Sequence, residues 1–82
     1  MKHFRPDYDR IQDPANLIPV DEPVFILRGQ DKHAAQTLRY YAYQVFADDG
    51  DLNIVKAVLD GAKLVDAWPK KKAPDMPAVK DD

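Results

Sequence analysis

The sequence predicts a small α+β domain in which one short strand precedes an antiparallel pair of helices. Self-association of the chain completes this predicted fold, and a mainly α fold is the alternative. The single apolar run at 24–27 has the length of a strand. Two later stretches repeat apolar residues at helical spacing and are separated by only a few residues. The chain has 82 residues and no cysteine, so its own core would be marginal and no disulfide can strengthen it.

Composition predicts three parts along the chain. Residues 1–16 contain two prolines and no repeating pattern, so we expect an extended N-terminal arm. Residues 17–69 hold the strand and both helices and are predicted to form a single folded domain. Residues 70–82 are rich in lysine, proline and aspartate, which predicts a disordered tail.

The predicted strand, Val24 to Arg28, is apolar on both faces, because alternate side chains of a strand point to opposite sides. Such a strand needs neighbours on its edges and cover on both faces. Residues 17–20 are a poor neighbour since Pro19 lacks an N–H group. We therefore expect the strand to pair with the same strand of a second copy, or to lie clamped between helices.

The first helix is predicted from about residue 32 to residue 47. Asp31 precedes it and is a suitable N-cap, because its carboxylate can accept from the exposed N–H groups of the first turn. The helix is expected to end in the turn 48–50, with Gly50 in the left-handed conformation.

The second helix is predicted from about residue 52 to residue 67, with Asp51 as its cap and Pro69 just beyond its end. Gly61 lies in its middle and costs about 1 kcal/mol relative to alanine. Close approach of another backbone would explain this glycine. The short connection makes the two helices antiparallel neighbours.

Charge and motif content narrow the classes of function. The net charge of −2 is not that of a general nucleic-acid binder, and no apolar run is long enough for a membrane span. His3 and His33 stand far apart without a ligand or catalytic pattern around them. We therefore predict that the protein is not an enzyme and uses neither metal nor cofactor. The N-terminal residues lack a signal-peptide pattern and the chain has no cysteine, which predicts a cytoplasmic protein.

The best candidate for a binding surface surrounds the turn between the strand and the first helix. Backbone N–H groups at such a turn suit an anion, arginine binds phosphate with two donors, and tyrosine offers a ring on which a base stacks. The predicted ligand-binding residues are Arg28, Gln30, Lys32, His33, Arg39, Tyr40 and Tyr43. In the alternative interpretation the arginines pair with nearby aspartates and the tyrosines fill an interface.

The segment from Ile18 to Asp31, with the pattern I-P-x-D-E-P-V-F-x-L-R-x-Q-D, resembles small uncharacterised proteins of phages and prophages. The D-G-D turn and the Trp68-Pro69 end of the second helix are similar to theirs as well. The resemblance implies an accessory protein that binds and thereby blocks or sequesters a host molecule.

From the surface and the resemblance together we expect a homo-oligomeric, non-enzymatic binding protein in the host cytoplasm. Its ligand would be a small nucleotide-like anion, and an anti-defence sponge for a signalling nucleotide is the favoured form. The alternative is a protein-binding inhibitor or adaptor that acts on a host protein.

Overall fold

The computed structural model describes residues 1–77 of the chain. These residues form two compact units, one comprising Leu27–Pro74 and the other Met1–Ile26 with residues 75–77. Residues 78–82 of the predicted tail lie outside the described residues. The predicted boundaries of arm, domain and tail remain predictions.

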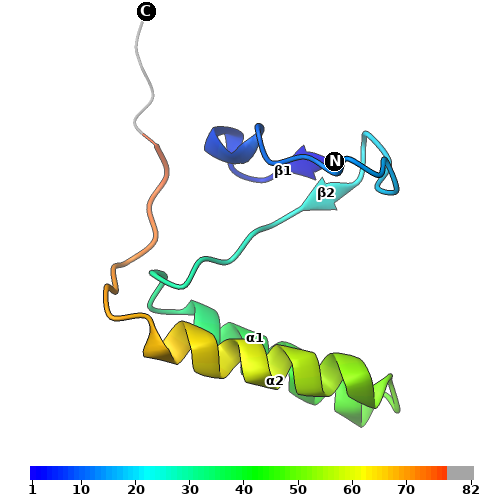
Figure 1. Ribbon diagram of the computed structural model, residues 1–82, viewed down its shortest axis with the longest axis vertical. Coiled ribbons are helices and arrows are strands. Elements are labelled where there is room, and N and C mark those ends of the chain that lie inside the picture. The colour runs from blue at the N-terminus through cyan, green and yellow to red at the C-terminus, as the bar shows by residue number, and fades with distance from the viewer. Residues whose placement is uncertain (78–82) are drawn as a thin grey trace, which may run out of the picture. The chain divides into compact units, whose positions relative to one another are not determined.

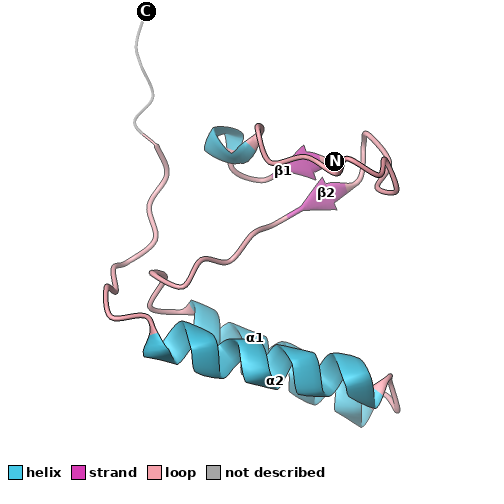
Figure 2. Ribbon diagram, in the orientation of Figure 1, coloured by secondary structure: helices cyan, strands magenta, loops and turns pink. Residues whose placement is uncertain are grey.

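The unit Leu27–Pro74 is a helical hairpin. Helix α1 spans Ala34–Ala47, helix α2 spans Leu52–Ala67, and the two pack against each other in opposite directions (Figure 1). Helices make up most of the regular structure (Figure 2), so the fold agrees with the mainly α alternative. No helix within residues 1–77 has the length and apolar character needed to cross a membrane.

The first helix begins two residues later than predicted, at Ala34. The carboxylate of Asp31 accepts from the N–H of His33 at 2.8 Å, and the carbonyl of Asp31 accepts from the N–H of Ala34 at 3.1 Å. Asp31 therefore closes a local turn before the helix instead of serving as its cap residue. His33 takes the cap position without a side-chain hydrogen bond.

The end of α1 corrects the prediction for Gly50. Asp49, not Gly50, has the left-handed conformation, with φ at 54°. The N–H of Gly50 donates to the carbonyl of Val45 at 2.8 Å, and the N–H of Asp49 donates to that of Phe46 at 3.1 Å. This is the Schellman pattern, in which the residue after the left-handed one closes the helix. Gly50 is needed for space, because a Cβ there would lie 2.5 Å from Val45 Cγ1.

Helix α2 has the predicted bounds, and its predicted cap is confirmed. The Asp51 side chain accepts from the N–H of Asn53 at 2.8 Å. The helix stops at Trp68, whose backbone is extended because Pro69 follows it. A Cβ added at Gly61 would meet nothing within 4 Å, so no close backbone approach within the chain accounts for this glycine.

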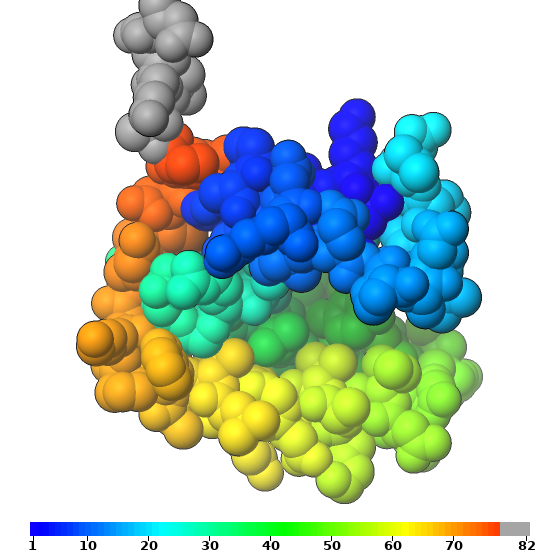
Figure 3. Space-filling model, turned by 45° about the horizontal axis from the view of Figure 1, so that its top comes forward, coloured from blue at the N-terminus to red at the C-terminus, as the bar shows by residue number. Residues whose placement is uncertain are grey.

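The interior of the hairpin contains only small side chains. The buried apolar residues of the described chain are Ala34, Ala35, Ala42 and Ala62, and no larger side chain there is fully buried. Leucines, tyrosines and a tryptophan instead lie on the surface. Helix α2 forms a large part of the surface seen in Figure 3, where it is yellow. Four alanines remove little apolar area from water, so the fully buried part of the core contributes little to stability.

The other unit contains a two-stranded parallel sheet. Strand β1, Lys2–His3, pairs with strand β2, Pro23–Val24, with Lys2 opposite Pro23. The prediction of a strand over 24–28 was wrong in extent, since β2 ends at Val24. It pairs with the N-terminal segment of the same chain instead of with a second copy, and self-association remains a prediction.

The sheet is short because β1 soon turns away. The N–H of Phe4 donates to the carbonyl of Val24 at 3.1 Å, and then a 3₁₀ turn, η1, begins at Pro6–Tyr8. Pro6 has no N–H group and cannot extend the ladder. The rings of Phe4 and Phe25 stack next to this last rung, with centroids 5.3 Å apart.

Candidate binding site

The turn before α1 is held by the segment that follows α2. The N–H of Lys72 donates to the carbonyl of Gln30 at 2.7 Å, and the N–H of Lys32 donates to that of Lys72 at 3.1 Å. These two bonds form a parallel bridge between Asp31 and Lys72. The bridge fixes the turn next to the end of α2.

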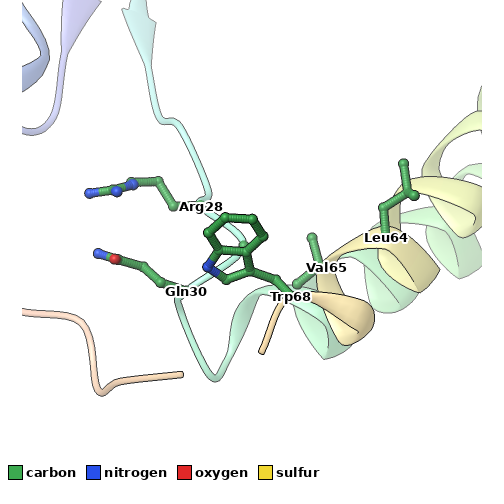
Figure 4. A pocket seen from close by; sticks show the side chains of 6 residues that line it. Arg28, Gln30, Leu64, Val65 and Trp68 are labelled. Atoms are coloured by element: carbon green, nitrogen blue, oxygen red, sulfur yellow. The ribbon is translucent and has the colours of Figure 1, made fainter. Parts of the chain in front are cut away.

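A pocket lies where this turn meets the last turns of α2. It has a volume of about 380 Å³. Its walls are formed by Arg28, Gly29, Gln30, Leu64, Val65 and Trp68. Arg28 and Gln30 point the same way from the turn, and the indole of Trp68 stands between them and Leu64 (Figure 4). The pocket thus combines an aromatic ring, apolar side chains and two hydrogen-bond donors.

Gly29 allows the indole to come this close. A Cβ at this position would lie 3.3 Å from Trp68 Cβ and 3.4 Å from Trp68 Cγ, which is tighter than an ordinary contact. Trp68 remains about half exposed, at 53%. One part of the side chain therefore packs on the turn while the rest remains accessible to a ligand.

Lys71 adds a positive charge beside the pocket. Its Nζ donates to the carbonyl of Gly29 at 2.7 Å and also to the carbonyl of Val65. Val65 belongs to the last turn of α2, where its carbonyl also accepts from the N–H of Trp68 at 3.1 Å and where a cation is favoured. Lys71 therefore links the turn to the end of α2.

The guanidinium of Arg28 makes no hydrogen bond or ion pair with any side chain in the described part of the chain. Two acidic residues of the same unit have partners of their own. Asp31 accepts from the N–H of His33, and Asp66 pairs with Arg39 across the hairpin. Arg28 is thus the exposed cation of the pocket.

The structure brings together only some of the residues predicted for the site. Arg28 and Gln30 line the pocket, whereas Lys32 and His33 lie in the following turn with exposed side chains. Arg39 forms its ion pair with Asp66, as the alternative interpretation expected. Tyr40 and Tyr43 lie on α1, 63% and 65% exposed, and do not line the pocket.

Sequence reasoning missed the contribution of α2 to this site. The site also includes four residues from the C-terminal end of α2 and the segment that follows it, namely Leu64, Val65, Trp68 and Lys71. The available signal was the single tryptophan of the chain, placed directly before the proline that ends α2. Aromatic rings are the side chains on which nucleic-acid bases stack.

The backbone N–H groups of the turn are less available than the sequence suggested. The N–H of Asp31 donates to the carbonyl of Arg28 at 3.0 Å, and those of Lys32 and His33 are bonded to Lys72 and Asp31. An anion in this pocket would therefore depend mainly on side-chain donors.

A second hollow, of about 570 Å³, lies in the unit that contains the sheet. Lys2, Asp9 and Asp21 are among its lining residues, so charges of both signs meet there. This mixture favours no particular ligand charge. Among residues 1–77 no three histidine, cysteine, aspartate or glutamate side chains come together to hold a metal ion.

Comparison of the chain with protein-family models, with curated proteins and with solved structures found no match. The function is therefore inferred from the residues of the pocket.

Proposed function

We propose that this chain is a non-enzymatic binding protein whose ligand is a small anion with a planar ring, of the nucleotide type. The observation that carries the proposal is the presence of Trp68 and the unpaired Arg28 on the same pocket. An indole face gives a base about 1–3 kcal/mol of stacking energy. A guanidinium binds phosphate with two parallel hydrogen bonds.

The charges around the pocket support an anionic ligand. Arg28 lines the pocket, and the ammonium of Lys71 is bonded to the backbone of two lining residues. Gln30 supplies an amide that can bond to the edge of a base. Trp68 takes the stacking role that the sequence assigned to Tyr40 or Tyr43.

Sequestration of a signalling nucleotide, as in a phage anti-defence protein, is the biological form of this proposal. It comes from the resemblance of the segment Ile18–Asp31 to phage proteins. Self-association belongs to the same proposal, because the hairpin buries only alanines and leaves its large apolar side chains exposed.

A thermal-shift panel on the full chain tests the proposal. The ligands are linear and cyclic nucleotides, with inorganic phosphate and uncharged nucleosides as separate arms. A bound nucleotide at 100 times its Kd stabilises the folded chain by about 2.7 kcal/mol. It should also quench the fluorescence of Trp68, the only tryptophan.

Arg28→Ala should abolish the shift without lowering the melting temperature of the free protein. Arg10→Ala is the matched control, because it removes the same charge from an exposed position in the other unit. A panel in which no nucleotide changes either the melting temperature or the fluorescence would contradict the proposal.

The second candidate function is a protein-binding inhibitor or adaptor. It is favoured by Tyr40 and Tyr43, which are 63% and 65% exposed on α1. Exposed tyrosines are enriched at protein interfaces. This candidate predicts no response in the nucleotide panel and a partner protein whose binding is lost in Tyr40→Ser/Tyr43→Ser, with the melting temperature unchanged.

A further inference from the structure

Helix α2 has a second apolar stripe beside the one that faces α1. It consists of Ile54, Ala57, Gly61, Leu64 and Trp68, which we call the α2 seam. These positions follow one another at steps of three and four residues, the spacing of positions a and d in a heptad. Such a stripe is the pattern that packs against another helix.

The stripe that faces α1 is already used. Its residues are Val55, Val58, Ala62 and Val65, which are buried or half-buried. The α2 seam is uncovered by contrast, since Leu64 is 75% exposed, Trp68 53% and Ile54 45%. The seam is therefore a helix-packing surface without a helix on it in the described chain.

We propose that a second copy of this chain covers the α2 seam, with its own α2 running antiparallel. In this arrangement an a residue of one helix shares a layer with a d residue of the other. Ala57 then lies opposite Trp68 of the second copy, and Gly61 lies opposite Leu64. Each of these layers combines a small side chain with a large one, so the two seams fill each other's gaps from Ala57 to Trp68. Ile54 falls opposite position 71, beyond the end of α2, and lies outside the paired layers.

Two-fold symmetry allows a second copy in either orientation, and packing favours the antiparallel one. Most soluble homo-oligomers are two-fold dimers, in which the same patch of both copies must be self-complementary. The parallel alternative would place Gly61 against Gly61 and Trp68 against Trp68. It would leave a void in one layer and crowd another.

The charge pattern permits one copy to face another. The seam contains no charged residue, so two identical seams meet without like-charge repulsion. At its solvent-facing edge Asp60 is paired with Lys56 at 2.7 Å, which neutralises the nearest charges of the rim. A charged partner would gain no electrostatic attraction from this surface, and an identical copy would meet no electrostatic repulsion.

Gly61 gives a further indication. Glycine in a helix interior is unfavourable, and nothing in the chain lies within 4 Å of a Cβ added there. Leu64 of the second copy would fill this space. The glycine then has a packing reason that the single chain lacks.

This inference rests on the self-association that the proposed function includes and specifies its surface, and it does not depend on a ligand. Leu64 and Trp68 belong both to the seam and to the pocket, so the second copy would add Ala57 to the wall beside the indole. Arg28 lies outside the seam. Arg28→Ala should therefore remove nucleotide binding and leave the dimer intact, which separates failure of one proposal from failure of the other.

Sedimentation velocity of the full chain over a wide concentration range tests the dimer. The wild type should pass from monomer to dimer as concentration rises. Leu64→Glu places a charge in the seam and should remain monomeric, with its helical circular dichroism unchanged. Leu52→Glu is the matched control, because Leu52 is 66% exposed on α2 but lies off the seam, and it should dimerise normally.

A spin label tests the orientation of the two helices. The chain has no cysteine, so Asn53→Cys carries a single label near the start of α2. Antiparallel seams separate the two labels by about 28 Å along the helix axis, from a rise of 1.5 Å per residue. Parallel seams bring them side by side.

A wild type that remains monomeric at every concentration overturns the proposal, and this result does not depend on any variant. A dimer that Leu64→Glu leaves intact overturns it as well, and so does a short distance between the labels. Concentration-dependent dimerisation that is lost in Leu64→Glu, kept in Leu52→Glu and accompanied by the long distance supports it.

Discussion

Gly29 and Trp68 are in contact, and a Cβ on Gly29 would lie only 3.3 Å from Trp68 Cβ. The two residues are far apart in sequence, one in the turn before α1 and the other at the end of α2. Their contact therefore ties the beginning of the hairpin to its end. It also presents the indole to the pocket that Arg28 and Gln30 line.

Gly29→Ala should displace the indole, because the added methyl group would lie too close to Trp68 unless that side chain shifts by a few tenths of an ångström. We expect the free energy of unfolding to fall by about 1 kcal/mol, at the low end of the cost of overpacking. The emission of Trp68 should shift, since it is the only tryptophan. Gly61→Ala is the control at concentrations where the chain is monomeric, because its Cβ has open space within the chain.

The turn between the helices gives a pair of opposite predictions. Gly50→Ala should lower the free energy of unfolding by about 1–3 kcal/mol, since its Cβ would lie 2.5 Å from Val45 Cγ1 and 2.8 Å from the carbonyl oxygen. Asp49→Gly should raise it by about 0.5–1 kcal/mol, because glycine adopts the left-handed conformation without strain. Urea unfolding measures both, and equal effects of the two variants would contradict this assignment of the Schellman motif.

The ion pair on α2 predicts a pH dependence. The ammonium of Lys56 lowers the pKa of Asp60, mainly through their hydrogen bond. Because the pKa is lower in the folded chain, the pair contributes stability above the unfolded value of about 3.9. That stability is lost as the pH falls through the lower folded pKa. Both side chains are exposed, so the gain is small.

Carboxyl chemical shifts of Asp60 measure this directly. Lys56→Met should move the titration midpoint of Asp60 upward, toward the ordinary value for aspartate. Lys63→Met should move it less, because Lys63 lowers the pKa of Asp60 only through a weaker charge interaction at longer range. A midpoint that Lys56→Met leaves in place would contradict the pairing.

The helices were predictable because their signals are local. The bounds of α2 follow from the cap at Asp51 and the proline after Trp68, and both act within one turn of the helix. The sheet was not predictable in the same way. The partner of β2 is β1, which has only two residues of the N-terminal segment. Lys2 comes to lie opposite Pro23 only through the tertiary fold, which local sequence patterns do not reveal. An apolar run over 24–27 also gives no sign that pairing stops at Val24.

Only one side of the candidate site, the turn before α1, was predicted from the sequence. Arg28 and Gln30 were identified because they flank a glycine at a strand–helix turn, which is a local pattern. Trp68 and Lys71 reach the same place through the antiparallel course of the hairpin. Neither residue has a sequence neighbour that indicates this contact, so the fold was needed to join the two halves.

The last prediction concerns Lys71, whose ammonium bonds to the carbonyls of Gly29 and Val65. Lys71→Met removes a cation from the C-terminal end of α2 and leaves the Gly29 carbonyl to water, while the Val65 carbonyl keeps the N–H of Trp68 at 3.1 Å. The free energy of unfolding should fall by about 0.3–1 kcal/mol, the usual worth of a charge at a helix end. Urea unfolding at low and at high salt measures the loss, and salt should reduce the difference because exposed charges are screened.

Lys70→Met is the matched control. It removes the same charge from the adjacent position, where the lysine makes no bond to the helix end in the described chain. Equal losses in the two variants would show that net charge, and not the link between the turn and α2, sets the effect.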